Sequence, residues 1–250
     1  MIWQDDKKFT INGQKFLCDT RGPKERLPST VNQFTIVKNK PFFKAYSDIN
    51  SEYSVNSILE LGIFQGGSAA FFMQYYEPEV FAAVEMSKNR IVALDEFVEK
   101  NGLQDTTELC YGMDQSDESA LEDLVKNKFP MGIDLIVDDA SHDYELSRKS
   151  FEILFSSVSP GGYYLVEDWS WAHSVASGKG VHPRQDLPAL TNLLFEMIMI
   201  LGSDSKEISS IVVHPNMFVI KKGHRAKVSQ DKYDIASHYR QRSNWPVKLI

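Results

Sequence analysis

The strongest constraint on the fold of this 250-residue chain is a regular alternation of strand-like and helix-like segments that begins at residue 57. Short apolar runs alternate with longer segments in which apolar residues recur at helical spacing. Such alternation predicts β-α-β units, because a helix must carry the chain back between two parallel strands. We therefore expect an α/β fold with a mostly parallel sheet and helices on both faces. The predicted strands are residues 57–61, 80–86, 107–112, 133–139 and 162–168.

The alternation stops after the fifth predicted strand. A helical pattern over residues 187–201 precedes two apolar runs, ISSIVVH and MFVIKK, which only Pro215 and Asn216 separate. A link this short can join antiparallel strands but not parallel ones. The sequence therefore predicts an antiparallel hairpin at one edge of the sheet.

The two ends of the chain differ from its middle. Residues 1–50 mix turn signals with a short apolar stretch, and we expect them to form a cap that recognises substrate. Residues 51–222 would form the main domain, in which the glycine-containing segment 169–185 would be a lid. Residues 223–250 form a basic tail, which could shield the acidic body or cover the active site.

Composition limits the class of partner. The chain is 42% apolar and 24% charged, as is common for soluble globular proteins, and its formal net charge is −7. Residues 51–220 hold 10 basic and 27 acidic side chains, which argues against a nucleic-acid groove. Two cysteines are too few for a disulfide framework, and no apolar run is long enough to span a membrane. We expect a cytoplasmic protein with a small-molecule partner, no nucleic-acid or membrane partner, and a possible homo-oligomeric state.

Charged residues end the fourth and fifth predicted strands. Asp138 and Asp139 are followed by His142, and the next strand ends in Glu167 and Asp168. In open α/β sheets, ligands bind outside the carboxyl ends of the strands, so these side chains could converge. Three carboxylates and a histidine suit a hard divalent metal ion with a general base beside it. The alternative is that the acids cap the following helices and the histidine is structural.

The first strand-to-helix turn carries glycines. It reads ELGIFQGGS over residues 60–68, with Gly62 and Gly66 spaced G-x-x-x-G rather than as a dinucleotide fingerprint. Glu85 ends the second strand 19 residues after Gly66, where a carboxylate can bind ribose hydroxyls. Together they indicate an adenosine-containing ligand bound without a pyrophosphate. A structural turn and an ordinary charge at a strand end would also explain these residues.

Five motifs in chain order carry a family resemblance. ELGIFQGGS, VEMS, YGMDQSD, DLIVDDASHD and SPGGYYLVEDW resemble the class I S-adenosylmethionine-dependent methyltransferases, with the match spanning roughly residues 55–170. Within them the chain most resembles the macrocin and mycinamicin sugar O-methyltransferases, whose relatives include rhamnosyl O-methyltransferases and cephalosporin hydroxylase-like proteins. The resemblance implies a Rossmann-like sheet of seven strands with a reversed final strand. It also implies S-adenosylmethionine as cofactor and Mg²⁺ as metal.

The resemblance assigns roles to individual residues. His142 would be the catalytic base, and the magnesium ligands would be Asp139, Glu167 and Asp168. The methionine part of the cofactor would lie near the glycine turn, the ribose near Glu85, and the adenine near the motif GMDQSD. The implied cofactor-binding residues are Glu60, Gly62, Gly66, Ser68, Glu85, Asp114, Gln115 and Asp138.

The expected reaction is methylation of a hydroxyl group of a sugar or glycosylated small molecule. Mg²⁺ could orient a diol and lower the pKa of the reacting hydroxyl, and His142 could take its proton. Trp169 and Trp171 could stack on a sugar ring or could anchor the loop. The alternatives are a catechol-type O-methyltransferase that acts on an aromatic diol and a non-catalytic, cofactor-binding assembly protein. The glycine spacing disfavours a nicotinamide oxidoreductase.

Overall fold

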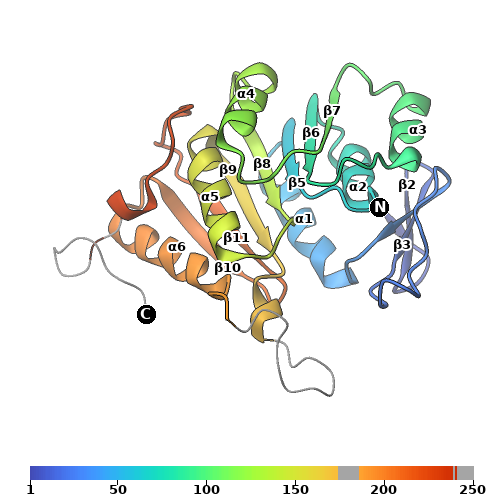
Figure 1. Ribbon diagram of the computed structural model, residues 1–250, viewed down its shortest axis with the longest axis horizontal. Coiled ribbons are helices and arrows are strands. Elements are labelled where there is room, and N and C mark those ends of the chain that lie inside the picture. Colours follow the sequence, from blue (N-terminus) through green and yellow to red (C-terminus); the bar gives the residue numbers. More distant parts are fainter. Residues whose placement is uncertain (174–185, 239, 241–250) are drawn as a thin grey trace. The chain divides into compact units, whose positions relative to one another are not determined.

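The computed structural model describes residues 1–173, 186–238 and 240, and the chain divides into two compact units, residues 1–114 and 115–250 (Figure 1). Most of the predicted lid lies outside the described residues, as does the end of the basic tail. In the part of the chain that is described, no helix is both long and apolar enough to cross a membrane.

A small sheet opens the first unit. Its strands, in spatial order, are β1 (Ile2–Trp3), β2 (Lys8–Ile11), β3 (Gln14–Cys18) and β4 (Gln33–Ile36). β2 and β3 form a hairpin around Asn12 and Gly13, whose φ values of 48° and 85° suit a tight two-residue turn. β3 and β4 pair in parallel. The predicted cap region therefore contains a sheet of its own, which was not predicted from the sequence.

The rest of the first unit follows the predicted alternation. Its elements are α1 (Lys40–Glu52), β5 (Ser57–Leu61), α2 (Gly67–Tyr76), β6 (Val80–Glu85), α3 (Val92–Lys100) and β7 (Thr107–Tyr111). β5 has its predicted bounds, and β6 and β7 each end one residue earlier than predicted. β5 pairs with β6, and β6 with β7, in parallel.

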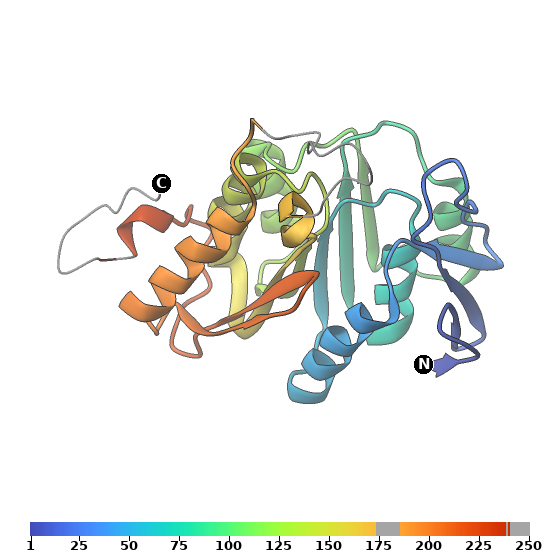
Figure 2. The same ribbon diagram turned by 90° about the horizontal axis from the view of Figure 1, so that it is seen from below.

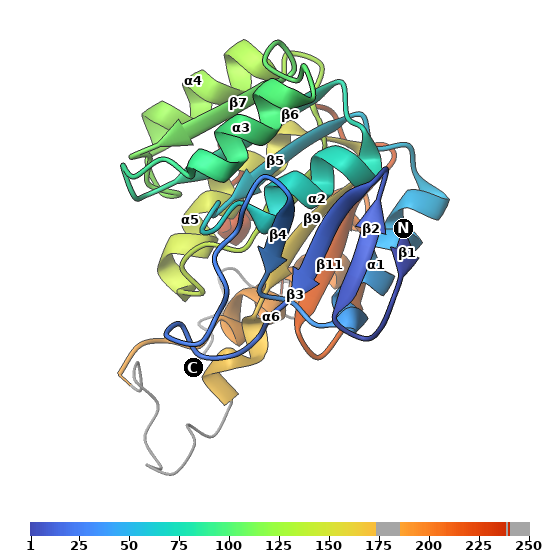
Figure 3. The ribbon, with the colours of Figure 1, turned by 90° about the vertical axis from the view of Figure 1, so that its right-hand side faces the viewer.

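Helix α2 lies against the small sheet (Figure 3). Its buried Phe71 packs edge-on against Phe9, Phe16 and Phe43, at ring-centroid distances of 6.1, 6.3 and 5.0 Å. The first residue of the helix, Gly67, lies so close to β4 that a Cβ atom there would come within 2.0 Å of a backbone oxygen. The small sheet therefore buries one face of the helix that follows the glycine turn.

The second unit begins with α4 and ends in the predicted hairpin. Its elements are α4 (Glu118–Lys128), β8 (Ile133–Asp138), α5 (Tyr144–Leu154), the 3-10 turn η1 (Phe155–Ser157), β9 (Val158–Glu167), the 3-10 turn η2 (Trp169–His173), α6 (Thr191–Ser203), β10 (Ile208–Val213), β11 (Met217–Lys222) and the 3-10 turn η3 (Ile235–Ser237). β8 and β9 are parallel, whereas β11 is antiparallel to both β9 and β10. Helix α6 packs against β10 (Figure 2). It begins four residues later and ends two residues later than predicted.

The strand order of the larger sheet is β10-β11-β9-β8-β5-β6-β7. It has seven strands, the β10–β11 hairpin stands at one edge, and β11 runs antiparallel to both of its neighbours, β9 and β10. The predicted fold class, a mostly parallel α/β sheet with a C-terminal antiparallel hairpin, is therefore confirmed.

The described part of the basic tail packs on α5 and η1. The backbone N–H of Tyr233 donates to the carbonyl of Glu152 at 2.6 Å, and that of Ser229 donates to Ser156 at 3.0 Å. Lys222, at the end of β11, is almost fully buried, and its burial lowers the pKa of the amine to about 8. Its Nζ lies within hydrogen-bonding distance, 2.7–3.2 Å, of four carbonyl oxygens, those of Phe155, Ser156, Val158 and Lys227.

Candidate functional site

The glycine turn after β5 has an unusual backbone. Gly62, Phe64 and Gly66 have φ values of 99°, 49° and 76°, in the left-handed region that glycine adopts most readily. Gly66 is the residue that precedes the first turn of α2. A Cβ atom at Gly66 would meet the side chain of Leu94 at 3.1 Å. The turn is therefore sharp, and it brings the backbone N–H groups of a helix start to the end of β5.

Glu85, at the end of β6, braces this turn. Its Oε2 accepts hydrogen bonds from the backbone N–H groups of Ile63 at 3.2 Å and Phe64 at 2.9 Å. Its Oε1 accepts one from Ser87 at 2.9 Å. A carboxylate oxygen can accept more than one hydrogen bond, so a half-buried Glu85 can hold the turn and still bind a hydroxyl group.

The other predicted cofactor residues of the first unit lie near the same strand ends. Glu60 is completely buried within β5, and Ser68 is half-buried as the second residue of α2. Asp114 is half-buried and follows the end of β7 by three residues. Gly67 has a packing role against β4, as described above. The first unit thus holds Glu60, Gly62, Gly66, Ser68 and Glu85 at or beside the β5–α2 turn.

In the second unit, Gln115 connects the loop after β8 to α5. Its Nε2 donates to Asp138 Oδ1 at 3.2 Å and to Ser150 Oγ at 3.0 Å, and its Oε1 accepts from the N–H of Ser141 at 2.9 Å. Asp138 is 2% exposed, and this burial raises the pKa of its carboxyl to about 6. Gln115 therefore positions both the last residue of β8 and the loop that carries His142.

Asp139, His142 and Asp168 come together outside the ends of β8 and β9. One ligand atom from each lies within 4.8 Å of the others, a spacing at which they could hold one metal ion. His142 Nε2 is 3.9 Å from Asp168 Oδ2. All three side chains are half-buried, so the group is reachable from solvent. We call these three residues the strand-end cluster.

Two members of the strand-end cluster have strained backbones. His142 and Asp168 both have φ of 54°, which is uncommon for residues other than glycine. Such strain is found preferentially at functional sites, where the surrounding structure holds it in place. For Asp168 that support comes from its backbone N–H, which donates to the carbonyl of Asn216 in the β10–β11 turn at 2.6 Å.

Glu167, the third predicted metal ligand, is the last residue of β9 and is 1% exposed. It pairs with Met217 of β11 and is not in the strand-end cluster. The third potential ligand atom of this cluster is instead a nitrogen of His142, which the sequence predicts as the base. The second unit therefore brings together two of the three predicted ligands and the predicted base.

The two tryptophans of η2 have different surroundings. Trp169 Nε1 donates to the carbonyl of His214 at 2.9 Å, which anchors the loop. Trp171 is 38% exposed, and its ring meets that of His142 edge-on at a centroid distance of 6.3 Å. A small pocket lies beside this ring pair. Its lining residues are His142, Asp143, Trp171, Ala172, Leu187, Pro188, Ala189 and Leu190.

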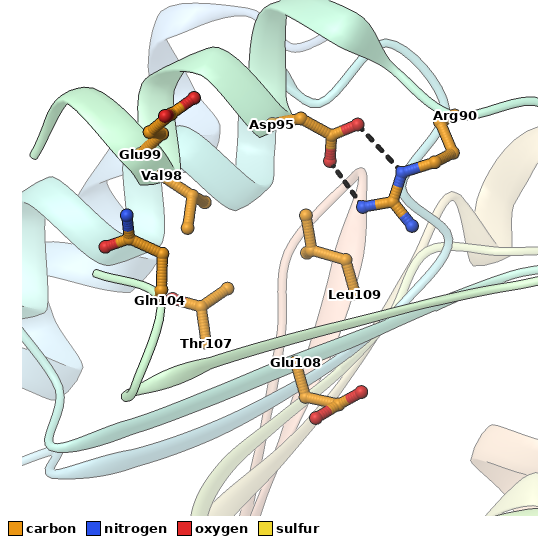
Figure 4. Close-up of a pocket in the computed structure, with 8 residues that line it drawn as sticks. All are labelled: Arg90, Asp95, Val98, Glu99, Gln104, Thr107, Glu108 and Leu109. Carbon is orange, nitrogen blue, oxygen red and sulfur yellow. Dashed lines mark hydrogen bonds and ion pairs between the residues drawn. The ribbon is translucent and has the colours of Figure 1, made fainter. Parts of the chain in front are cut away.

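A larger pocket in the first unit, about 480 Å³, lies between α3 and β7 (Figure 4). Arg90 and Asp95 form an ion pair at its edge, with a distance of 2.7 Å. The glycine turn, Glu85 and Asp114 do not line this pocket. It is therefore separate from the residues that the sequence predicts to bind the cofactor.

The residues that hold the site residues in place were not predicted from the sequence. The turn residue Asn216 holds the strained Asp168, and Ser141 and Ser150 are linked through Gln115. Asn216 is 48 positions from Asp168 in the sequence, so no local pattern could pair them. Only the antiparallel pairing of β9 and β11 brings the two residues together.

Comparison with known proteins finds a methyltransferase domain in part of the chain. Residues 59–169 match the model of a methyltransferase domain. The chain is 38% identical over 78 residues to demethylmacrocin O-methyltransferase of Streptomyces fradiae, which is 31% of this chain and 19% of that protein. It is 33% identical over 85 residues to mycinamicin VI 2''-O-methyltransferase of Micromonospora griseorubida, which is 34% of this chain and 21% of that protein.

A solved structure extends the likeness to most of the chain. It is that of MycE, a methyltransferase of mycinamycin biosynthesis, in complex with Mg, SAH and mycinamycin VI. The TM-score is 0.55 at 21% identity, over 74% of this chain and 49% of that one. The chain thus spans about half of MycE, and the matches cover about a fifth of the two curated relatives. Residues 59–169 thus match a methyltransferase domain, and the chain is similar to the O-methyltransferases of demethylmacrocin and mycinamicin VI.

Proposed function

We propose that this protein is a cytoplasmic, Mg²⁺-dependent and S-adenosylmethionine-dependent O-methyltransferase that acts on a hydroxyl group of a sugar or glycosylated small molecule. The strand-end cluster carries the proposal, because two carboxylates and an imidazole lie close enough to act on a single hydroxylated ligand. The matched relatives are O-methyltransferases of demethylmacrocin and mycinamicin VI, and the solved relative was crystallised with Mg and SAH. These properties belong to the relatives, and they support the same chemistry here.

The donor sets fit both groups. Asp139 and Asp168 offer the carboxylate oxygens that Mg²⁺ prefers, with buried Glu167 next to Asp168 in the chain. The left-handed glycine turn and Glu85 offer N–H donors and a carboxylate, as a nucleoside with a charged amino-acid tail requires. We assign the cofactor to Glu60, Gly62, Gly66, Ser68, Glu85, Asp114, Gln115 and Asp138, and the metal to Asp139, Glu167 and Asp168.

In this reaction the protein positions the acceptor hydroxyl and accepts its proton. When bound, S-adenosylmethionine supplies a methyl group activated by its sulfonium sulfur. For the acceptor oxygen to take up that methyl group, its hydroxyl must lose its proton. His142 Nε2 takes that proton, and Asp168, whose Oδ2 is 3.9 Å away, stabilises the imidazolium that forms. Trp171 beside His142 offers an aromatic face to the acceptor.

The test is a methyl-transfer assay with purified full-length chain and a panel of acceptors. The panel should contain rhamnosylated and macrolide-type glycosides, their aglycones, and a catechol. We expect transfer to a glycoside, loss of activity in EDTA and recovery with Mg²⁺. Transfer to the catechol alone would instead identify a catechol-type enzyme, and full activity in EDTA would refute the metal assignment.

Two further measurements separate catalysis from mere binding. In calorimetry, the wild-type protein should bind S-adenosylhomocysteine, and Glu85→Ala should weaken this binding. Asp139→Asn should leave this binding intact but raise the Mg²⁺ concentration needed for half-maximal activity at least about tenfold. A protein that binds the cofactor product but transfers no methyl group to any acceptor would be a non-catalytic member of the fold.

A further inference from the structure

A second group of potential metal ligands lies in the second unit, on different elements from the strand-end cluster. Asp204 follows the end of α6, Glu207 precedes β10, and His238 follows η3 in the basic tail. One ligand atom from each lies within 4.8 Å of the others, and His238 Nδ1 is 3.8 Å from Asp204 Oδ2. We call these three residues the tail cluster. It joins the α6–β10 turn to the C-terminal segment.

The two carboxylates are carried on a tightly held turn. The N–H of Asp204 closes α6 by donating to Ile200 at 2.7 Å, and the N–H of Glu207 donates to the carbonyl of Asp204 at 3.1 Å. The N–H of Gly223, just after β11, donates to the carbonyl of Glu207 at 2.9 Å. A Cβ atom at Gly223 would lie 1.8 Å from the carbonyl oxygen of Lys206, so the two segments are in close backbone contact. The carboxylates are therefore placed by the fold and not by flexible loops.

A buried hydroxyl provides an independent indication of a ligand. Tyr233 is 4% exposed, and its hydroxyl has no hydrogen-bond partner among the described residues. Burial raises the pKa of Tyr233, and the negative charges of Glu207 and Asp204 raise it further. The ring of His238 stacks on that of Tyr233, with a centroid distance of 4.3 Å and an interplanar angle of 6°. A buried polar group without a partner in the protein points to a bound water or ion.

We propose that the tail cluster binds a divalent transition-metal ion, with Zn²⁺ as the representative, and that this ion fastens the C-terminal segment to the α6–β10 turn. An imidazole combined with carboxylates suits Zn²⁺ or Co²⁺, whereas Mg²⁺ and Ca²⁺ favour oxygen ligands alone. Three protein ligands leave a position for water, and a metal-bound water can donate a hydrogen bond to Tyr233 Oη. The ion would thereby satisfy the buried hydroxyl.

The test uses Co²⁺ as the probe, because its visible absorption reports the ligands that bind it. The full chain should carry Asp139→Asn and Asp168→Asn, so that the strand-end cluster no longer contributes. This parent should bind about one Co²⁺ per chain, and Zn²⁺ should displace it. Glu207→Gln and His238→Phe should each weaken Co²⁺ binding at least about tenfold. His238→Phe keeps a ring against Tyr233 but removes the ligand atom, which separates metal binding from packing.

The matched control is His224→Ala, which removes an exposed histidine of the same C-terminal segment outside the tail cluster. It should bind Co²⁺ as the parent does. Zn²⁺ should also slow hydrogen exchange at the backbone N–H of Tyr233 and His238 in the parent, but not in His238→Phe. A parent that binds no Co²⁺, or a His238→Phe variant that binds it as tightly as the parent, would overturn the proposal.

Discussion

His142 and Asp168 face each other across 3.9 Å, from Nε2 to Oδ2, and both hold a left-handed backbone with φ of 54°. Neither residue is a glycine, so each conformation costs free energy, on the order of 1–3 kcal/mol. The two residues lie on separate loops, after β8 and after β9. The fold therefore stabilises an unfavourable backbone conformation at both residues. Each of the two residues places a functional group in the strand-end cluster.

Replacement of the proposed base should reduce turnover more than binding. We expect His142→Ala to lower kcat by a factor of about 10² to 10⁴, because the variant has no group to accept the hydroxyl proton. Calorimetry should show unchanged affinity for S-adenosylhomocysteine. His224→Ala, at an exposed histidine of the same unit, is the control and should keep wild-type kcat. A His142→Ala variant with kcat within threefold of wild type would exclude His142 as the base.

Because α2 and β4 are in close contact at Gly67, replacement of this glycine should destabilise the fold. Gly67→Ala would put a Cβ atom 2.0 Å from the carbonyl oxygen of Thr35, and we expect it to lower the free energy of unfolding by about 1–3 kcal/mol. The control is Gly202→Ala within α6, where the added methyl group meets nothing within 4 Å. That variant should gain about 0.5–1 kcal/mol from helix propensity. Urea denaturation of both variants measures the contrast, and equal stabilities would contradict the packing role.

Buried Lys222 should make stability depend on alkaline pH. Its pKa is lowered to about 8 in the folded protein and returns to about 10.5 on unfolding, so the unfolded chain binds more protons between these values. Stability contributed by this group should therefore rise as the pH increases from about 8 to 10.5, by up to about 3 kcal/mol. The measurement is the difference in unfolding free energy between wild type and Lys222→Met at successive pH values. A difference that stays constant over this range would refute the shift.

At neutral pH the same lysine should still hold the tail. Lys222→Met removes an ammonium group that lies 2.7–3.2 Å from four carbonyl oxygens, and we expect a loss of about 1–3 kcal/mol at pH 7. Lys227→Met is the control, because the side chain of Lys227 is exposed and only its carbonyl contacts Lys222. A similar loss in both variants would indicate a general effect of charge.

The two tryptophans of η2 should give opposite results. Trp171→Ala should raise the KM for the acceptor with little change in stability, because this ring is 38% exposed beside His142. Trp169→Ala should lower the free energy of unfolding by about 1 kcal/mol or more, because the variant loses the hydrogen bond that Trp169 Nε1 donates to the carbonyl of His214. Steady-state kinetics and thermal unfolding of both variants test this division. A larger KM effect at Trp169 than at Trp171 would reverse the assignment.

The sequence was most informative where the pattern is local. The run SILEL has the bounds of β5, and the strands that follow it begin where their apolar runs begin, except β9. Burial on both faces of a parallel strand demands a continuous apolar run, so composition alone marks such strands. The short link at Pro215 and Asn216 allowed the hairpin to be predicted for the same kind of reason. The small N-terminal sheet was missed, although Asn12 and Gly13 are a hairpin signal.

The sequence by itself determined the alternation of strands and helices, the glycine turn, and the two strand ends at which the proposed catalytic and metal-binding residues stand. These features depend on residues that are neighbours in the chain. The tertiary structure alone decided that His142 joins Asp139 and Asp168, that Asn216 supports the backbone of Asp168, and that His238 lies beside Asp204. Each of these pairings depends on strand register and on the packing of distant segments. No local pattern of residues predicts either of these two properties.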